Sequence, residues 1–350
     1  MKSRRTALHP NLPGIAQVLF FCCFGLAPLS AQGPTLDPAL RSSLPAEGIY
    51  ALKVDVDSVF LNLSVRDRRT SRSLEGLQKM DFSIYEDGIR QQADEFLPTQ
   101  SPFNLLLLLD TSGSTGSYLK MMRRAAIEFT RKIGENDRVA VATFNSKVRL
   151  VQSLTGDRRE AERALKRIKS GGGTAFYDAL MVSIDRYLKP VQGRSAIVVF
   201  TDGIDNQLEG RPESGSRSGF DELLDRIKKA DVLVYSIFLN TDEPSADAAG
   251  TPGPCGFPRL CSVYRQAKEQ LALMADQTGG RMYSPRKIDE LSGAYSEIAD
   301  DLRVQYQLGY NSTNRACDGK WRSIQVELEG HPDAVIRTRR GYYARREATQ

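Results

Sequence analysis

Five side chains that carry oxygen lie next to predicted elements. Four of them follow predicted buried strands, and the fifth lies just before a predicted helix. Three belong to one short run, Asp110-Thr-Ser112-Gly-Ser114; Thr174 ends a Ser-Gly-Gly-Gly-Thr run and Asp202 is the centre of Thr-Asp-Gly. Carboxylate and hydroxyl oxygens without nitrogen or sulfur suit a hard divalent cation. Together these residues would bind Mg²⁺, with Mn²⁺ or Ca²⁺ as alternatives, and leave much of the cation's charge uncompensated. Such a cation would take up a carboxylate from another protein.

The three runs fall at one edge of a predicted sheet. Apolar segments at 103–109, 138–144, 195–201 and 232–238 have the length and composition of strands covered on both faces. Because these strands alternate with helical patterns, we expect an α/β fold: an open, mostly parallel sheet with helices on both faces. Ligands bind beyond the carboxyl ends of the strands in such sheets, where the five residues fall. The predicted helices cover residues 117–134, 158–168, 175–188, 221–230, 264–277 and 288–303.

Each run also has a plainer interpretation. Residues 110–114 could be only a strand-to-helix turn whose hydroxyl caps the next helix, and Thr174 could be such a cap by itself. The glycine run lacks the Gly-Lys-Ser/Thr ending of a phosphate-binding loop. The presence of all three runs, in this order, favours the metal site over separate caps. Asp205, just beyond Thr-Asp-Gly, is interpreted as a loop-capping residue and not as a further ligand.

The five residues, in this order, closely resemble the metal-ion-dependent adhesion site of von Willebrand factor type A domains. The resemblance covers about residues 103–300. It implies that the two serines bind the metal directly, that the threonine binds it directly or through water, and that the acidic pair lies mostly behind them. It also implies a non-enzymatic domain that captures an Asp or Glu carboxylate of a partner protein. The flanking runs LQKMDFSIYEDGIRQQADEF and RTRRGYYA resemble those of exported bacterial, acidobacterial-type relatives of this family.

β-rich segments are predicted on both sides of the α/β core. Residues 51–98 alternate apolar and polar side chains around an Asp87-Gly88 hairpin signal. Residues 304–345 alternate again, with strands expected at 304–310, 321–329 and 335–340. The C-terminal strands are too few to bury a face alone, so we predict that the two segments form one split β unit. The basic residues near the end are interpreted as a solvated strand edge: Arg337, Arg339, Arg340, Arg345 and Arg346.

Residues 1–31 are typical of a cleaved export signal. Three basic residues within positions 2–5 precede an apolar stretch at 14–29, and small residues lie just before a cleavage point at Gln32. A membrane anchor is the alternative, but the stretch falls short of the ~20 residues needed to span a bilayer. We therefore expect a periplasmic or secreted mature chain that is not inserted in the membrane, beginning with a linker at 32–50.

Composition disfavours several function classes. Lys and Arg number 48 against 43 Asp and Glu, and without the three basic residues of the signal the excess is too small to indicate nucleic-acid binding. His9 and His331 are the only histidines, which argues against histidine-based zinc sites and Ser-His-Asp hydrolases. A disulfide between Cys255 and Cys261, in a Pro/Gly-rich loop, would fit an oxidising compartment. Cys317 has no assigned partner.

Three functions follow from these patterns. The favoured one is metal-dependent binding of a partner protein, with loops 205–219 and 239–262 selecting the partner. The second is a structural envelope component whose metal only holds the loops in place. The third, metal-dependent hydrolysis, is disfavoured because no histidine lies near the site to act as a base. The partner's identity and the oligomeric state are not predicted.

Overall fold

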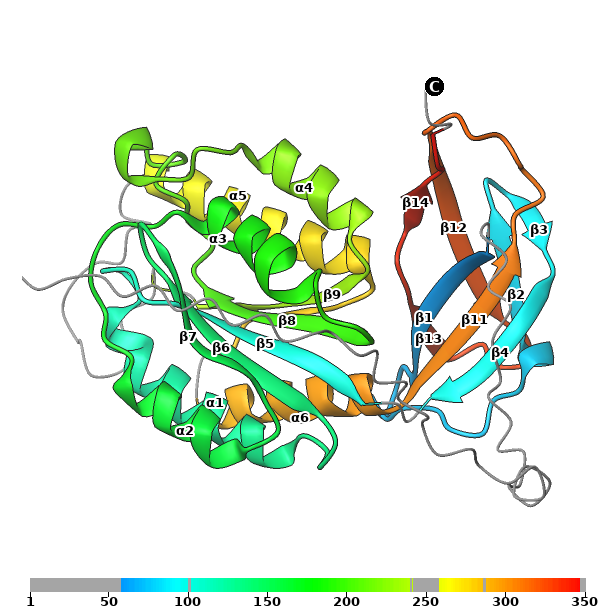
Figure 1. Ribbon diagram of the computed structural model, residues 1–350, viewed down its shortest axis with the longest axis horizontal. Helices are drawn as coiled ribbons and strands as arrows, with labels where there is room; N and C mark the ends of the chain where they lie inside the picture. The colour runs from blue at the N-terminus through cyan, green and yellow to red at the C-terminus, as the bar shows by residue number, and fades with distance from the viewer. Residues whose placement is uncertain (1–57, 100–101, 240, 242–257, 286–287, 347–350) are drawn as a thin grey trace, which may run out of the picture. The chain divides into compact units, whose positions relative to one another are not determined.

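The computed structural model describes residues 58–99, 102–239, 241, 258–285 and 288–346. It contains one six-stranded sheet and two four-stranded sheets (Figure 1). The predicted export signal, the linker, Cys255 and most of loop 239–262 lie outside the described residues. Within the described ranges, no helix is both long and apolar enough to cross a bilayer.

The six-stranded sheet confirms the expected open, mostly parallel arrangement. Its strand order is β10-β9-β8-β5-β6-β7, and only the last pair, β6 with β7, is antiparallel. The strand β5 lies inside the sheet, and all eight of its residues are buried. The strands are β5 Phe103–Asp110, β6 Arg138–Phe144, β7 Val148–Thr155, β8 Arg194–Thr201, β9 Val232–Phe238 and β10 Met282–Tyr283.

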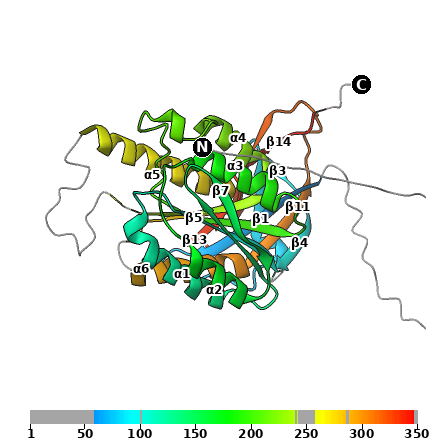
Figure 2. The same cartoon turned by 60° about the vertical axis from the view of Figure 1, so that its left-hand side comes forward.

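The apolar side chains of β5 pack on both faces of this sheet. Successive side chains of a strand point to opposite faces, so Leu105 and Leu107 pack with α1, α2 and α6, whereas Leu106 and Leu108 pack with α3, α4 and α5. Figure 1 and, from a second side, Figure 2 show these two helical layers. The helices are α1 Leu119–Lys132, α2 Arg158–Arg167, α3 Phe176–Val182, α4 Phe220–Lys229, α5 Pro258–Thr278 and α6 Ile288–Arg303.

Two local features of the core differ from the sequence prediction. The helix expected at 175–188 is α3 followed by a π-helical segment, η4 (Ser183–Leu188), in which the Lys189 amide donates to the Ile184 carbonyl at 2.8 Å. The edge strand β7 is not predicted because its residues are half-buried or exposed and carry no clear apolar alternation. Neither difference changes which strands carry the five residues.

The two β-rich segments pair with each other in both four-stranded sheets. In the sheet β13-β1-β11-β4, the strand β1 has a C-terminal strand on each side, with Leu61 opposite Leu308 and Val65 opposite Ile336. In the sheet β14-β12-β2-β3, the strand β2 pairs with β12. One hydrophobic core joins the two sheets. The strands are β1 Ser58–Asp67, β2 Phe82–Glu86, β3 Ile89–Gln91, β4 Ala93–Thr99, β11 Gln305–Asn311, β12 Trp321–Leu328, β13 Ala334–Arg337 and β14 Gly341–Tyr343.

The hairpin expected at Asp87-Gly88 joins β2 to β3. Both residues have positive φ, 48° and 79°, as a two-residue turn between twisted strands requires. The last strand predicted, 335–340, ends early as β13 at Arg337, and the chain then crosses at 338–340 to β14 in the other sheet, a strand that is not predicted. Tertiary hydrogen bonds fix this crossing: the Arg340 amide donates to Gln277 of α5, and the Arg340 carbonyl accepts from Ile324.

Candidate metal centre

Two buried carboxylates lie at the carboxyl ends of the adjacent strands β5 and β8. Asp110 is the last residue of β5, and Asp202 directly follows β8; both side chains are fully buried. The Thr201 hydroxyl donates to Asp110 Oδ2 at 2.6 Å, which ties the two strand ends together. The parallel pairing of β5 with β8 thus brings two residues 92 positions apart in the sequence to one edge.

The two serines extend this cluster toward solvent. The Ser112 amide donates to Asp110 Oδ1 at 2.8 Å, and the hydroxyl oxygens of Ser112 and Ser114 lie 3.1 Å apart. Ser114 also hydrogen-bonds the Asp202 carboxylate. Ser112 is buried and Ser114 is exposed. Four of the five predicted residues therefore form one connected group that is open at Ser114.

Thr174 is held beside this group by its loop. The Gly171 amide donates to the Thr111 carbonyl at 2.7 Å, and the Gly113 amide donates to the Gly172 carbonyl at 3.1 Å. Gly171 and Gly172 have φ values of 142° and 102°, a backbone that side chains oppose. Thr174 itself is buried, and its amide donates to the Asn206 side chain. The glycine run is therefore the means by which a third loop closes onto the Asp-x-Ser-x-Ser turn.

The two carboxylates have no ion-pair partner among the residues that the structure describes. Among the described residues, no Lys or Arg forms an ion pair with Asp110 or Asp202, as the salt bridges of the chain all lie elsewhere. Burial and the neighbouring Asp202 raise the pKa of Asp110 to about 7, and burial also raises the pKa of Asp202. Buried carboxylates are normally paired or bound to metal. The donor set thus fits a hard divalent cation.

This cluster differs from the usual carboxylate and histidine cages. Within the ranges that the structure describes, no group of three or more His, Cys, Asp or Glu side chains is placed to hold a metal. The cluster offers two carboxylates, with hydroxyls as its other oxygens. Neutral hydroxyl ligands quench less of a cation's charge than carboxylates do, so a cation held here would keep charge with which to attract an external anion.

Three supporting residues are absent from the sequence prediction. Thr201 bonds Asp110, Thr241 donates to Asp202 Oδ2 at 3.1 Å, and Asn206 bonds both the amide and the carbonyl of Thr174. Thr201 could have been found, since it is the last residue of a buried strand and precedes Asp202. Thr241 and Asn206 come from loops whose course no local pattern predicts.

Asp205 is placed as a capping residue, in line with its sequence interpretation. Its Oδ2 accepts from the Phe176 amide at 2.7 Å, at the start of α3, and its Oδ1 accepts from the amides of Gln207 and Ser216 at 3.0 Å. The side chain is fully buried. Asp205 therefore fastens loop 205–219 to the helix that follows Thr174.

Residues 105–204 match the family of the von Willebrand factor type A domain, a segment that includes all five residues of the cluster. The chain contains a von Willebrand factor type A (VWA) domain. The chain is similar to an uncharacterized protein of Synechocystis, with 35% identity over 106 residues, 29% of this chain and 25% of that one. It is also similar to mouse inter-alpha-trypsin inhibitor heavy chain H3, with 29% identity over 125 residues, 32% of this chain and 14% of that one. The chain thus spans a quarter or less of these two relatives.

Solved structures with similarity to the chain include two further proteins. BatB of Bacteroides thetaiotaomicron is 18% identical, with a TM-score of 0.41, over 57% of this chain and 98% of that one. Proximal thread matrix protein 1 of the mussel byssus, solved with a zinc-occupied MIDAS motif, is 13% identical, with a TM-score of 0.45, over 62% of this chain and 50% of that one.

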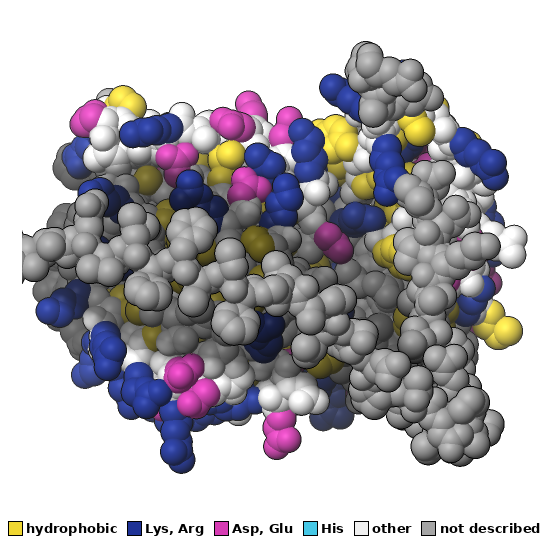
Figure 3. Space-filling view, viewed as in Figure 1, with side chains coloured by type: hydrophobic (Ala, Val, Ile, Leu, Met, Phe, Trp, Pro, Cys, Tyr) yellow, Lys and Arg dark blue, Asp and Glu magenta, His cyan; other side chains and the backbone are white. Residues whose placement is uncertain are grey.

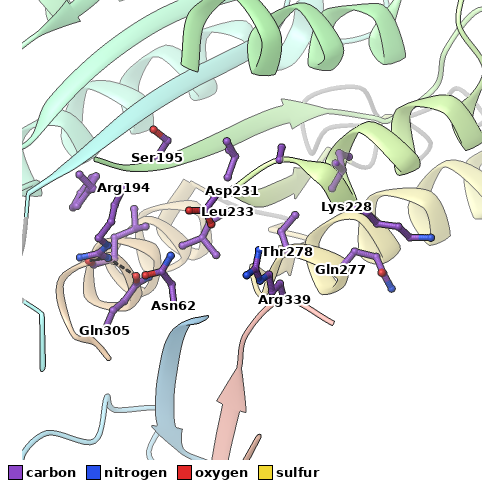
Figure 4. Close-up of a pocket in the computed structure, with 15 residues that line it drawn as sticks. Asn62, Arg194, Ser195, Lys228, Asp231, Leu233, Gln277, Thr278, Gln305 and Arg339 are labelled. Atoms are coloured by element: carbon purple, nitrogen blue, oxygen red, sulfur yellow. Dashed lines mark hydrogen bonds between the residues drawn. The ribbon is translucent and has the colours of Figure 1, made fainter. Parts of the chain in front are cut away.

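A separate small cavity lies at the opposite edge of the VWA sheet. It has a volume of about 30 Å³ and is lined by residues at the starts of β5, β8 and β9 together with Asn62 and Gln305 of the β unit (Figure 4). Figure 4 shows polar side chains directed toward it, and Arg194 donates to the Gln305 side chain. A cavity of this size has room for about one or two water molecules and is too small for an organic ligand. It plays no part in the cluster of Asp110 and Asp202.

Proposed function

We propose that the VWA domain binds a partner protein through a divalent cation held by Asp110, Ser112, Ser114, Thr174 and Asp202. The cation, Mg²⁺ in the first instance, would supply an electrophilic centre for an Asp or Glu carboxylate of the partner. The observation that carries this proposal is the buried pair of carboxylates without a protein counter-ion, beside hydroxyls that open to solvent. The proposal is non-enzymatic, because neither histidine of the sequence belongs to the three runs that form the cluster.

Loop 205–219, at the rim of the site, is suited to selecting the partner. Loop 205–219 is fixed at its base by Asp205 and Asn206. Farther along the loop, Glu209 forms an ion pair with the exposed Arg211. A rigid base with polar groups at the tip is typical of loops that present contacts to a ligand. We further propose that the protein is exported, on the basis of the signal-like residues 1–31.

Metal binding is tested by titrating the EDTA-treated protein with Mg²⁺, Mn²⁺, Ca²⁺ and Zn²⁺ in a calorimeter. We expect one site per chain that is lost in Ser112→Ala and Asp110→Ala. Ser153→Ala, an exposed serine on the edge strand β7, is the matched control and should bind as the native chain does. Equal binding by Ser112→Ala and Ser153→Ala would show that the metal lies elsewhere.

Partner capture is tested separately, with the full chain immobilised and envelope extract passed over it in Mg²⁺ or in EDTA. We expect a partner that is retained only in Mg²⁺, is lost with Asp110→Ala, and elutes with free acetate or glutamate. Metal binding without any metal-dependent partner would favour the structural envelope role over protein capture. Metal-dependent turnover of esters or phosphoesters would overturn the non-enzymatic assignment.

A further inference from the structure

A pocket of about 380 Å³ lies in the β unit, formed by the start of β1, the end of β11 with the segment that follows it, and β14. The pocket is built from residues far from the VWA cluster in the sequence. Its volume is at the lower end of the range of small-molecule sites. The lining residues are Ser58, Val59, Asn311, Ser312, Asn314, Arg315, Ala316, Cys317, Arg339, Tyr342, Tyr343, Ala344 and Arg345.

The charged side chains that line this pocket are all positive. Arg315, Arg339 and Arg345 contribute to it, and no Asp or Glu is among the described residues that line it. Arg315 and Arg345 are exposed and form no ion pair within the described part of the chain. Arg339 lies 5.7 Å from the Tyr342 ring and donates to the Phe60 carbonyl. Figure 3 shows Lys and Arg side chains over the upper part of the β unit, where this end of it lies.

The pocket corrects the interpretation of the C-terminal arginines as a uniform solvated edge. Arg340 forms an ion pair with Asp276 at 2.7 Å, and Arg337 donates to the Gly280 carbonyl, so both fasten the chain to the region of α5. Arg339 and Arg345 instead line the pocket together with Arg315, which comes from the segment after β11. Convergence from separate segments is not expected of charges that only keep a strand edge in solution.

A buried carboxylate fixes the floor of the pocket. Glu86 is 2% exposed and accepts hydrogen bonds from Ser312 at 2.6 Å, Tyr310 at 2.7 Å and Tyr342 at 3.0 Å. Ser312 and Tyr342 also line the pocket, so Glu86 holds two of its walls in place from behind. The single negative charge of Glu86 balances only one of the three arginine charges in sum, so the pocket keeps a net positive charge for a ligand.

We propose that this pocket binds a small polyanion, either phosphorylated or multiply carboxylated, with Arg315, Arg339 and Arg345 as its positive groups. Guanidinium groups bind phosphate and carboxylate oxygens through paired hydrogen bonds. The Tyr342 ring, against which Arg339 lies, offers a surface for a flat or sugar-like part of the ligand. The concave shape favours a small molecule over an extended anionic surface.

Cys317 provides a direct reporter of occupancy, because it is a free, exposed thiol in the lining. The full chain is treated with a thiol reagent, and modification of the Cys317 peptide is followed by mass spectrometry at constant ionic strength set with NaCl. The probes are inorganic phosphate, a sugar phosphate, citrate, acetate and a neutral sugar. At ten times the dissociation constant, a polyanion should slow modification about tenfold, whereas the neutral sugar should have no effect.

Substitutions identify the groups responsible. Arg315→Gln and Arg345→Gln should each raise the polyanion concentration that gives half-protection about tenfold or more, the loss of affinity expected for one charge-assisted contact. Arg346→Gln removes an equal charge from the adjacent exposed residue, which does not line the pocket, and should leave protection unchanged. Protection by the sugar phosphate but not citrate assigns phosphate chemistry, and the reverse assigns polycarboxylates. No protection by millimolar polyanion, or equal loss in Arg346→Gln, would overturn the proposal.

Discussion

At the scale of single residues, Thr201 makes a contact on which the carboxylate pair depends. Its hydroxyl donates to Asp110 Oδ2 and accepts from the Gly203 amide at 2.9 Å. This bond lowers the pKa of Asp110 against the effect of burial, because it stabilises the ionised form. Thr201 therefore helps to keep Asp110 charged and available to a cation.

We expect Thr201→Val, which keeps the shape of the side chain, to weaken metal binding about tenfold or more, since a hydrogen bond to a charged group contributes about 1.5–3 kcal/mol. Calorimetric titration with Mg²⁺ measures this loss. Thr130→Val is the matched control, a fully buried threonine whose hydroxyl bonds only the Ile127 carbonyl of α1. Unchanged affinity in Thr201→Val would mean that Asp110 does not act through this bond.

The carboxylate pair also predicts how stability depends on pH. Burial and Asp202 raise the pKa of Asp110 from 3.8 to about 7. Between about pH 4 and pH 7, Asp110 therefore keeps its proton in the folded protein but has released it in the unfolded chain. In EDTA, the contribution of Asp110 to the free energy of unfolding should fall as the pH rises from about 4 to 7. A cation favours the ionised form, so Mg²⁺ should raise the Tm more at pH 8 than at pH 5.

Thermal unfolding at several pH values, with and without Mg²⁺, measures this dependence. Asp110→Asn, which cannot ionise, separates the contribution of Asp110 from that of the other acids of the chain. We expect the variant to lose both the slope assigned to Asp110 and the stabilisation by Mg²⁺. A native chain in EDTA with the same pH profile as Asp110→Asn would contradict the prediction.

At the scale of elements, Asp205 joins a loop to a helix. It accepts from amides at the start of α3 and from amides within loop 205–219. We expect Asp205→Ala to lower the free energy of unfolding by about 3 kcal/mol, because several buried amides would lose their acceptor. Urea unfolding measures this change. The exposed Asp333→Ala should stay within about 0.5 kcal/mol of the native value, and a similar small change in Asp205→Ala would contradict the capping role.

The elements differ in how far the sequence predicts them. The strand β5 is predictable because FNLLLLLD is a continuous apolar run. Four residues of the cluster are predictable as well, because they come directly after the ends of such strands. The π-helical η4 is not, since i→i+5 hydrogen bonds leave no trace in apolar spacing. The crossing at 338–340 depends on contacts with Gln277 and Ile324, residues brought near only by the whole fold. The limits proposed for the VWA domain, 103–300, stay a prediction.

At the scale of the whole molecule, a buried ion pair joins the β unit to the VWA core. Arg66 of β1 and Asp301 of α6 are both almost fully buried, and the Arg66 Nε contacts Asp301 Oδ1. Arg281 reaches the other oxygen of Asp301 at 3.3 Å. The pair therefore links a strand of the N-terminal segment to the last helix before the C-terminal strands.

We expect Asp301→Ala to lower the free energy of unfolding by about 3–5 kcal/mol, because the buried Arg66 loses its buried carboxylate and keeps only the more exposed Glu297, at 3.5 Å. Urea unfolding followed by circular dichroism measures this loss. Arg131→Ala, which removes an exposed pair with Glu162, should cost about 1 kcal/mol or less. A comparable effect of the two substitutions would show that the buried pair adds nothing specific to the junction.

The division of the β unit between both ends of the chain has a consequence for biosynthesis. The strand β1 has only C-terminal strands as neighbours, and about 200 residues separate β4 from β11. At a ribosomal rate of ~5–20 residues per second, the first strands wait about 10–40 s for their partners to be made. The VWA core, whose strands lie close together in the sequence, can form during that interval. The β unit, although its first strands are made before the core, therefore closes after the core.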